Sequence, residues 1–238
     1  VVKDQFEISL IRTALKIQEE ALEAVLKKLK PGITGLELAA RLEAEMKARG
    51  SSQPGFQSIV GSGGGAALPH YRPGKVKIAP NKVLLIDWGA NVDGYNADLT
   101  RTFGIGHLPA KLQEVYGVVL DAQLAAIDAI RPGRVCAEID AVARNIITKA
   151  GYGPQFGHGL GHGLGMDVHE GPYFNNLQMD VKLEPGMVMT VEPGIYIPGV
   201  GGVRIEDDVV VTDDGCRVLS DYPKDLDSMI VEPLAARA

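Results

Sequence analysis

The sequence predicts a single α+β domain built from two similar halves. In each half, two helix-forming segments divided by a Pro-Gly pair come first, and a β-hairpin carrying a pair of acids follows. No linker or low-complexity segment separates the halves, so an internal structural duplication explains the repeated order. We therefore expect both hairpins to lie in one sheet, with the helices packed outside it.

The first helical pair is marked by periodicity and by capping residues. Apolar residues recur every three or four positions from Asp4 to Lys30, which predicts a long helix that Pro31-Gly32 ends. Thr34 precedes a second helix from Gly35 to Arg49, with Glu37 placed three residues later as in a capping box. A loop rich in serine and glycine then leads to the first hairpin.

Helical spacing returns in the second half, over Pro109 to Ile130 and Ala137 to Ala150. Pro132-Gly133 divides these two segments just as a Pro-Gly pair divides the earlier ones. The same order of elements thus begins again, as a duplication requires.

Asp87 and Asp98 flank the turn of the first predicted hairpin. The strands are Val83 to Asp87 and Tyr95 to Arg101, and the turn is Asn91 to Gly94. Residues equidistant from a turn lie opposite each other, with Cβ atoms about 5 Å apart. We expect the two carboxylates to face each other.

Glu192 and Glu206 are placed in the same way in the second hairpin. The loop Pro198 to Gly202 lies midway between them, with Val188 to Ile197 before it and Val203 to Thr212 after it. Carboxylates at this distance repel unless one holds a proton or a cation lies between them. A facing pair in two hairpins favours a metal site, although solvated acids on edge strands remain the alternative.

A glycine-rich run, residues 157–172, separates the hairpins and holds His158, His162 and His169, three of the five histidines. So many glycines make a helix improbable and let the backbone approach whatever the imidazoles touch. A phosphate-binding loop is the alternative, but the run lacks the Lys-Ser/Thr that closes a P-loop. A lone histidine is usually structural, whereas a cluster beside paired acids indicates a functional site.

The candidate donors suit a pair of divalent ions. Four carboxylates and at least one imidazole are enough to hold two ions, and such ligands favour Mn²⁺, Co²⁺ or Zn²⁺ over a thiolate-seeking metal. A water shared by two such ions becomes hydroxide near neutral pH, and the ions also polarise a carbonyl. Hydrolysis of an amide is therefore the expected reaction class.

Composition excludes several other classes. The 238 residues are 45% hydrophobic with a net charge of −6, and no dense Lys/Arg run offers a nucleic-acid surface. No apolar stretch is long enough to span a bilayer, and the charged N-terminal segment is unlike a signal peptide, so we expect a cytoplasmic protein. Cys136 and Cys216 lack metal-site or disulfide spacing and are expected to be buried thiols. Because the first residue is Val, we expect a piece of a longer protein.

Taken together, these residues resemble the M24 metallopeptidases, the family of Xaa-Pro aminopeptidases, prolidases and methionine aminopeptidases. The resemblance spans nearly the whole chain and rests on the ordered acids and histidine, on Pro69-His70-Tyr71 and on four segments: 98–103, 158–172, 191–194 and 204–207. It implies the pita-bread fold (the creatinase/aminopeptidase fold) with a pseudo-twofold duplication. Residues 1–238 would form one catalytic domain without the N-terminal domain of longer members.

The resemblance also implies a role for each candidate residue. Two divalent ions, with Mn²⁺ the first expectation, would be held by five ligands: Asp87 on one ion, Asp98 and Glu206 as bridges, and His162 and Glu192 on the other ion. His70 and His169 would flank the substrate, His158 would line the pocket, and Glu192 would also relay a proton. Arg101 and Arg204 would orient carboxylates from behind, with structural ion pairing as the alternative.

Within the family, the histidine run and the Pro-His-Tyr triplet look like the proline-specific branch. The resemblance thus implies hydrolysis of the peptide bond next to proline in a small peptide, with a homodimer left open. A methionine aminopeptidase-like activity and a non-catalytic peptide-binding module are the alternatives. All five ligand positions carry competent residues, which favours an enzyme over the binding module.

Overall fold

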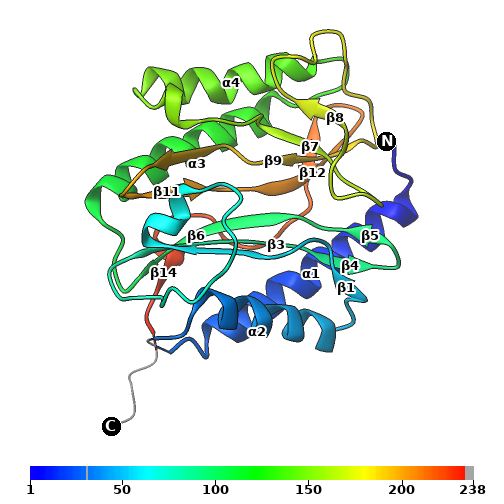
Figure 1. The fold of residues 1–238 in the computed structure, drawn as a ribbon. Coiled ribbons are helices and arrows are strands. Elements are labelled where there is room, and N and C mark those ends of the chain that lie inside the picture. The colour runs from blue at the N-terminus through cyan, green and yellow to red at the C-terminus, as the bar shows by residue number, and fades with distance from the viewer. Residues whose placement is uncertain (31, 234–238) are drawn as a thin grey trace.

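The computed structural model describes residues 1–30 and 32–233. Its strands form a central layer between two pairs of helices, with one pair below the strands and one pair above them in Figure 1. The helices are α1 (Gln5–Leu26), α2 (Gly35–Ala48), α3 (Ala110–Ala129) and α4 (Cys136–Lys149), and the short 3-10 turns are η1 (Gly63–Ala67), η2 (Gly153–Gln155) and η3 (Asp227–Met229). The architecture is the predicted α+β arrangement with helices outside the strands.

The helix starts follow the capping signals in the sequence. Asp4 caps α1 with Glu7 as its reciprocal partner, and Thr34 with Glu37 forms the predicted capping box of α2. Helix α1 ends at Leu26, four residues before the predicted end. Leu29, the last residue of the apolar pattern, lies after the helix and is still buried. Pro31 of the predicted break lies outside the described residues. No helix in the described ranges is long and apolar enough to cross a membrane.

The strands are short and numerous. They are β1 (Gln53–Pro54), β2 (Ile59–Ser62), β3 (Val83–Trp88), β4 (Ala90–Val92), β5 (Tyr95–Asn96), β6 (Leu99–Ile105), β7 (Gly161–Gly163), β8 (Glu170–Phe174), β9 (Val188–Val191), β10 (Gly194–Ile197), β11 (Gly201–Arg204), β12 (Asp207–Val211), β13 (Cys216–Val218) and β14 (Ile230–Val231). Each helical pair is followed along the chain by antiparallel strands, as the duplication predicts.

The two hairpins do not share one sheet, which corrects the prediction. Strands β3 and β6 belong to a four-stranded sheet of order β14-β6-β3-β2, whereas β9 and β12 belong to a five-stranded sheet of order β13-β12-β9-β7-β8. The second hairpin continues into β10 and β11, which form a separate two-stranded sheet. Where β6 meets β11, the Thr102 hydroxyl donates to the Arg204 carbonyl (2.9 Å) and accepts from the Arg204 amide (3.1 Å). A side chain thus takes the place of a ladder partner, and the sheets form a seam instead of one continuous surface.

The register of the first hairpin also differs from the prediction. Asp87 of β3 pairs with Thr100 of β6, so Asp98 is not directly opposite it. The cause is the turn, because Asp93 and Gly94 both have positive φ (49° and 89°) and together form a two-residue connection. The turn centre lies one residue later than the prediction assumed, which shifts the partner of Asp87 by two residues.

The second hairpin has the predicted register. Gly194 pairs with Arg204 in one ladder and Val191 pairs with Asp207 in the next, which is the same alignment of the two strands. Glu192 and Glu206 therefore lie opposite each other in the gap between the two ladders. Both acids lie outside the regular strands, in the breaks between β9 and β10 and between β11 and β12.

Candidate active site

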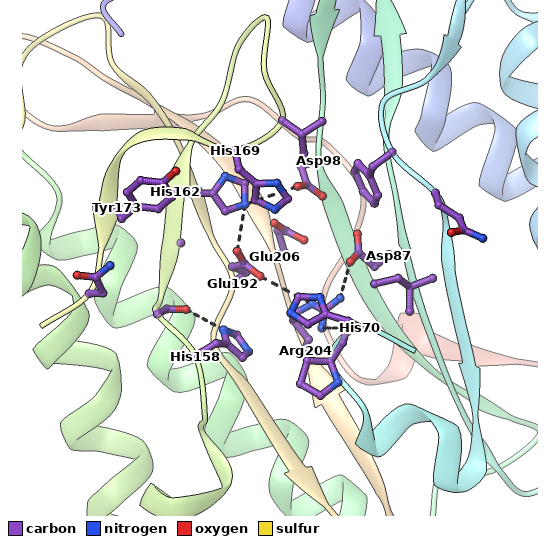
Figure 2. Close-up of a pocket in the computed structure, with 18 of the residues that line it drawn as sticks. His70, Asp87, Asp98, His158, His162, His169, Tyr173, Glu192, Arg204 and Glu206 are labelled. Atoms are coloured by element: carbon purple, nitrogen blue, oxygen red, sulfur yellow. Dashed lines mark hydrogen bonds and ion pairs between the residues drawn. The ribbon is translucent and has the colours of Figure 1, made fainter. Parts of the chain in front are cut away.

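A cavity of about 640 Å³ opens at the seam between the sheets. Every predicted site residue except Arg101 lines it, and Figure 2 shows their side chains converging from both halves of the chain. The predicted residues on its wall are His70, Asp87, Asp98, His158, His162, His169, Glu192, Arg204 and Glu206. The further wall residues include Phe56, Tyr173 and Asn175, which the sequence did not single out.

The five predicted metal ligands come from strands or from residues adjoining them. Asp87 lies in β3, Asp98 directly precedes β6, and His162 is the middle residue of β7. Glu192 directly follows β9, and Glu206 lies between β11 and β12. Rigid strands from both sheets thus fix the donors, as a preorganised site needs.

Three of the five bring their donor atoms closest together. One donor atom each from Asp98, His162 and Glu206 lies within 4.8 Å of the others, and all three side chains are buried. Asp87 and Glu192 lie outside this trio but adjoin it, because His162 Nε2 is 3.3 Å from Glu192 Oε1 and Asp87 lines the same cavity. The arrangement can hold a metal between the two sheets.

The carboxylates themselves indicate that a cation belongs here. Asp87 Oδ1, Asp98 Oδ1 and Glu206 Oε1 are buried and have no hydrogen-bond partner among the described residues. Burying a carboxylate oxygen without a donor is costly, and a divalent cation satisfies several such oxygens at once. Hard oxygen donors with one imidazole nitrogen are a suitable set for Mn²⁺, Co²⁺ or Zn²⁺.

The two acids of the trio, Asp98 and Glu206, have pKa values above those of ordinary carboxylates. Burial raises the pKa of Asp98 well above its usual range, and the nearby charges of Glu206 and Asp87 raise it further. Burial likewise raises the pKa of Glu206 well above normal, with added repulsion from Glu192 and Asp87. A bound cation would displace these protons, so its affinity should rise with pH.

His162 and Glu192 form a coupled pair. Burial by itself would raise the pKa of Glu192, but the hydrogen bond with His162 and the positive charges of His162, His158 and Arg204 together lower the pKa to about 2. Burial would lower the pKa of His162, and the contact with Glu192 instead raises it. A metal ligand must be neutral imidazole, so His162 would release its proton on binding a cation.

Arg204 is buried behind the acids and reaches two of them. Its Nη2 donates to Asp87 Oδ2 (2.5 Å), and its Nε lies 3.9 Å from Glu192 Oε2. The same Nε donates to Thr100 Oγ1 (2.9 Å), whose hydroxyl donates to Glu206 Oε2 (2.6 Å). Arg204 thus fixes one oxygen of Asp87 directly and one oxygen of Glu206 through Thr100, as an orienting role requires.

Arg101 lies away from the cavity and contacts no carboxylate of the predicted ligands. Its Nη2 donates to Asp207 Oδ1 (2.8 Å) and to the Tyr222 carbonyl (2.7 Å), and its Nε donates to the Pro223 carbonyl (2.8 Å). It also donates to the carbonyl oxygen of Glu206. These contacts match structural ion pairing, the alternative named for this residue, and they anchor the backbone that carries Glu206.

The three histidines around the ligands differ in how they are held. His158 Nδ1 is 2.7 Å from the Gly159 carbonyl and its Nε2 is 2.8 Å from the Tyr196 hydroxyl, and burial lowers the pKa of this imidazole. The His169 ring lies against His162, with 4.3 Å between centroids. His70 reaches the cavity from the loop after η1, on the Arg204 side in Figure 2.

Two polar residues of this network were not predicted. Thr100 links Arg204 to Glu206, and the Tyr196 hydroxyl accepts from Arg204 Nη1 (2.9 Å) while contacting His158. Each is a polar side chain on a buried strand near a predicted ligand, and that pattern is the signal that could have identified it.

The glycines that flank His162 serve strand packing. A Cβ on Gly161 would lie 2.1 Å from the Thr190 carbonyl, and a Cβ on Gly163 would lie 2.6 Å from the Gly171 carbonyl. These close backbone contacts are with β9 and β8, and residues 161–163 form a strand of the five-stranded sheet instead of a phosphate-binding loop.

The buried donor set, the duplicated architecture and the histidine run together indicate a candidate metal centre of the kind found in metallopeptidases, and comparison with known proteins places the chain in such a family. The chain belongs to metallopeptidase family M24, whose model matches residues 9–213. Its solved structural relatives have the pita-bread fold, which the α+β architecture matches.

Three relatives illustrate the likeness. The Xaa-Pro dipeptidase of Pyrococcus horikoshii is 41% identical over 95% of this chain and 64% of its own length. The prolidase structure from Pyrococcus furiosus gives a TM-score of 0.91 at 40% identity, over 94% of this chain and 66% of that one. The X-Pro aminopeptidase structure from Thermotoga maritima gives 0.93 at 40% identity, over 97% and 64%. The chain therefore spans somewhat less than two thirds of the length of these relatives.

Proposed function

We propose that this chain is the catalytic domain of a hydrolase that cleaves the peptide bond next to proline, in Xaa-Pro dipeptides or in peptides that begin with Xaa-Pro. The observation that carries the proposal is the set of buried carboxylate oxygens without hydrogen-bond donors, gathered around His162 in one cavity. The names of the relatives, an Xaa-Pro dipeptidase, a prolidase and an X-Pro aminopeptidase, support the choice of substrate.

Five residues would hold two divalent ions, with Mn²⁺ as the first candidate and Co²⁺ or Zn²⁺ as alternatives. Asp87 would serve one ion, His162 and Glu192 the other, and Asp98 and Glu206 would bridge them. When bound, the ions supply a shared water acidic enough to be hydroxide near neutral pH and an electrophile for the scissile carbonyl.

The protein prepares the carboxylates by holding one oxygen and leaving the other free. Arg204 holds Asp87 Oδ2 and Thr100 holds Glu206 Oε2, while Asp87 Oδ1 and Glu206 Oε1 have no partner among the described residues. This division orients the lone pairs of the free oxygens before any cation arrives. Outer-shell contacts of this kind commonly change metal affinity or activity by about 10- to 100-fold.

The remaining groups would act on the peptide. The nitrogen of the scissile bond belongs to the proline ring and carries no hydrogen, so the departing amine must receive a proton. Glu192 lies in the cavity with the other proposed ligands, where it could deliver one. His169 and His70 would donate hydrogen bonds at the scissile amide and at the carbonyl oxygen as it gains charge. His158, held by Tyr196, would form part of the pocket wall.

A metal-dependence and substrate panel tests the proposed function. We expect chelated protein to be inactive, and readdition of Mn²⁺ to restore hydrolysis of Xaa-Pro dipeptides or Xaa-Pro-Yaa peptides, measured by release of the free amine. Met-initiated peptides without proline serve as the control substrates and should not be cleaved.

Two results would contradict the proposal. Cleavage of the Met-initiated peptides alone would replace it with a methionine aminopeptidase-like activity. Failure to bind two metal equivalents, without turnover of any peptide, would favour a peptide-binding module.

A further inference from the structure

The first residues of the chain form a buried ion pair with the loop that carries His169. Lys3 is 6% exposed, and its ammonium group pairs with Glu170 and donates to the Val1 carbonyl (3.1 Å). Its backbone amide donates to the Gly186 carbonyl (2.8 Å), so the lysine is anchored at both its backbone and its side chain. Figure 1 shows the N-terminus lying beside the strands of the second half.

The ion pair packs directly on the loop between β7 and β8. A Cβ on Gly165 would lie 2.6 Å from Glu170 Oε1 and 2.7 Å from Lys3 Cε, so the pair leaves room only for glycine. The opposite side of the loop is held by Asn96, whose amide donates to the Gly165 carbonyl (2.9 Å) and whose side chain donates to the Met166 carbonyl (2.8 Å). The loop is therefore clamped between the first hairpin and the N-terminal segment.

The His169 side chain has few contacts of its own. It is exposed, and no hydrogen bond joins its ring to another residue in the described ranges. The ring only stacks at a tilt on His162, beside Asp98 in Figure 2. The backbone at the adjacent residue, Glu170, is thus the nearest fixed point, and Lys3 fixes it.

We propose that Lys3 is a positioning residue: its ion pair with Glu170 holds the backbone that places His169 against His162 at the cavity. This inference rests on the proposed function for its effect on rate, since His169 is there one of the two histidines that act at the scissile amide and at the carbonyl oxygen as it gains charge. A group that acts only on developing charge changes kcat more than KM. A small displacement of such a group can lower the rate by about 10- to 100-fold.

A double-mutant cycle separates positioning from general stabilisation. We expect Lys3→Met to lower kcat about 10-fold or more with little change in KM and in bound metal, and Lys3→Arg to restore most of the rate. In a His169→Ala background, Lys3→Met should cause no further loss, because the two residues act through one effect. Lys27→Met, which removes a lysine paired with Glu23 on α1, is the matched control and should behave as the wild type.

Hydrogen exchange tests the same idea without any substrate. Lys3→Met should speed exchange of the amides in residues 164–171, and Lys27→Met should not. The proposal is overturned if exchange in that loop is unchanged, or if the losses from Lys3→Met and His169→Ala multiply. If the wild type cleaves no peptide but Lys3→Met still speeds exchange in residues 164–171, the positioning role of Lys3 is supported and the proposed function is wrong.

Discussion

Replacing Asp98 with asparagine is expected to lower peptide hydrolysis by a factor on the order of 10³, while making the metal-free protein more stable near neutral pH. In the proposed dinuclear centre Asp98 would bridge both ions, so activity would be lost because a neutral amide cannot replace the charge of the carboxylate. Stability rises because the carboxylate is buried next to Glu206 and Asp87, whose charges repel it. Replacing buried charged groups with uncharged groups of similar volume can gain about 1 to 4 kcal/mol, and we expect a gain within this range.

The pH dependence of this gain follows from the raised pKa of Asp98. In the unfolded chain the carboxyl group titrates near pH 4, whereas burial keeps it protonated to a much higher pH in the folded protein. The stability of the folded protein that depends on protonated Asp98 is therefore fully present below about pH 4, and it is lost as pH rises through the pKa of Asp98 in the folded protein. The melting temperature of chelated wild type should fall across this range, and that of Asp98→Asn should fall less.

Calorimetry in chelator between about pH 4 and pH 8 measures this effect, with Asp93→Asn as the matched control. Asp93 is an exposed aspartate in the turn of the same hairpin, where its positive φ also suits asparagine. Destabilisation by Asp98→Asn at every pH, or retention of both metal equivalents, would contradict the account.

Replacing Arg204 with methionine is expected to destabilise the metal-free protein by about 3 to 5 kcal/mol, the usual cost of removing one partner of a buried ion pair. The substitution leaves the buried carboxylate of Asp87 without its guanidinium and removes the donor to Thr100 and to Tyr196. Added Mn²⁺ should recover part of the loss, because a cation also neutralises Asp87.

Chemical denaturation with and without Mn²⁺ measures the Arg204 effect. Arg49→Met is the control, since Arg49 pairs with Glu45 on the partly exposed surface of α2 and should matter by about 1 kcal/mol at most. A loss below about 1 kcal/mol for Arg204→Met would mean that the guanidinium does not compensate the buried acids.

The helices and the second hairpin were predictable because local signals set them. Capping residues fixed the starts of α1 and α2, and the loop from Pro198 to Gly202 placed its centre midway between Glu192 and Glu206. The first hairpin was misaligned because a two-residue turn at Asp93-Gly94, not the whole segment from Asn91, determines the register. A one-residue error in the turn centre changes every partner along the strands.

The separation of the hairpins into two sheets had no sequence signal, because it arises from a long-range contact. The Thr102 side chain forms hydrogen bonds with the Arg204 backbone in place of the backbone hydrogen bonds between paired strands. No sequence pattern near Thr102 predicts this partner. The same limit applies to Asp207 and Asp208, which follow Glu206 directly. Asp207 points to Arg101, Ser220 and Lys224, and only the folded strand shows that it faces away from the cavity.

The five candidate ligands could be predicted because their order and spacing resemble a known family, and the structure places all five on the wall of one cavity. The supporting layer could not be identified in the same way. Thr100 and Tyr196 act through contacts with Arg204, and such contacts depend on how two sheets meet. Sequence patterns report periodicity along one chain segment, not the geometry between segments.

Anomalous diffraction from crystals grown with Mn²⁺, measured at the manganese edge, tests the central claim most directly. We predict two peaks in the cavity, both within bonding distance of Asp98 and Glu206, with Asp87 on one side and His162 with Glu192 on the other. A single peak, or peaks that leave Asp98 and Glu206 without a metal between them, would contradict the proposed dinuclear centre.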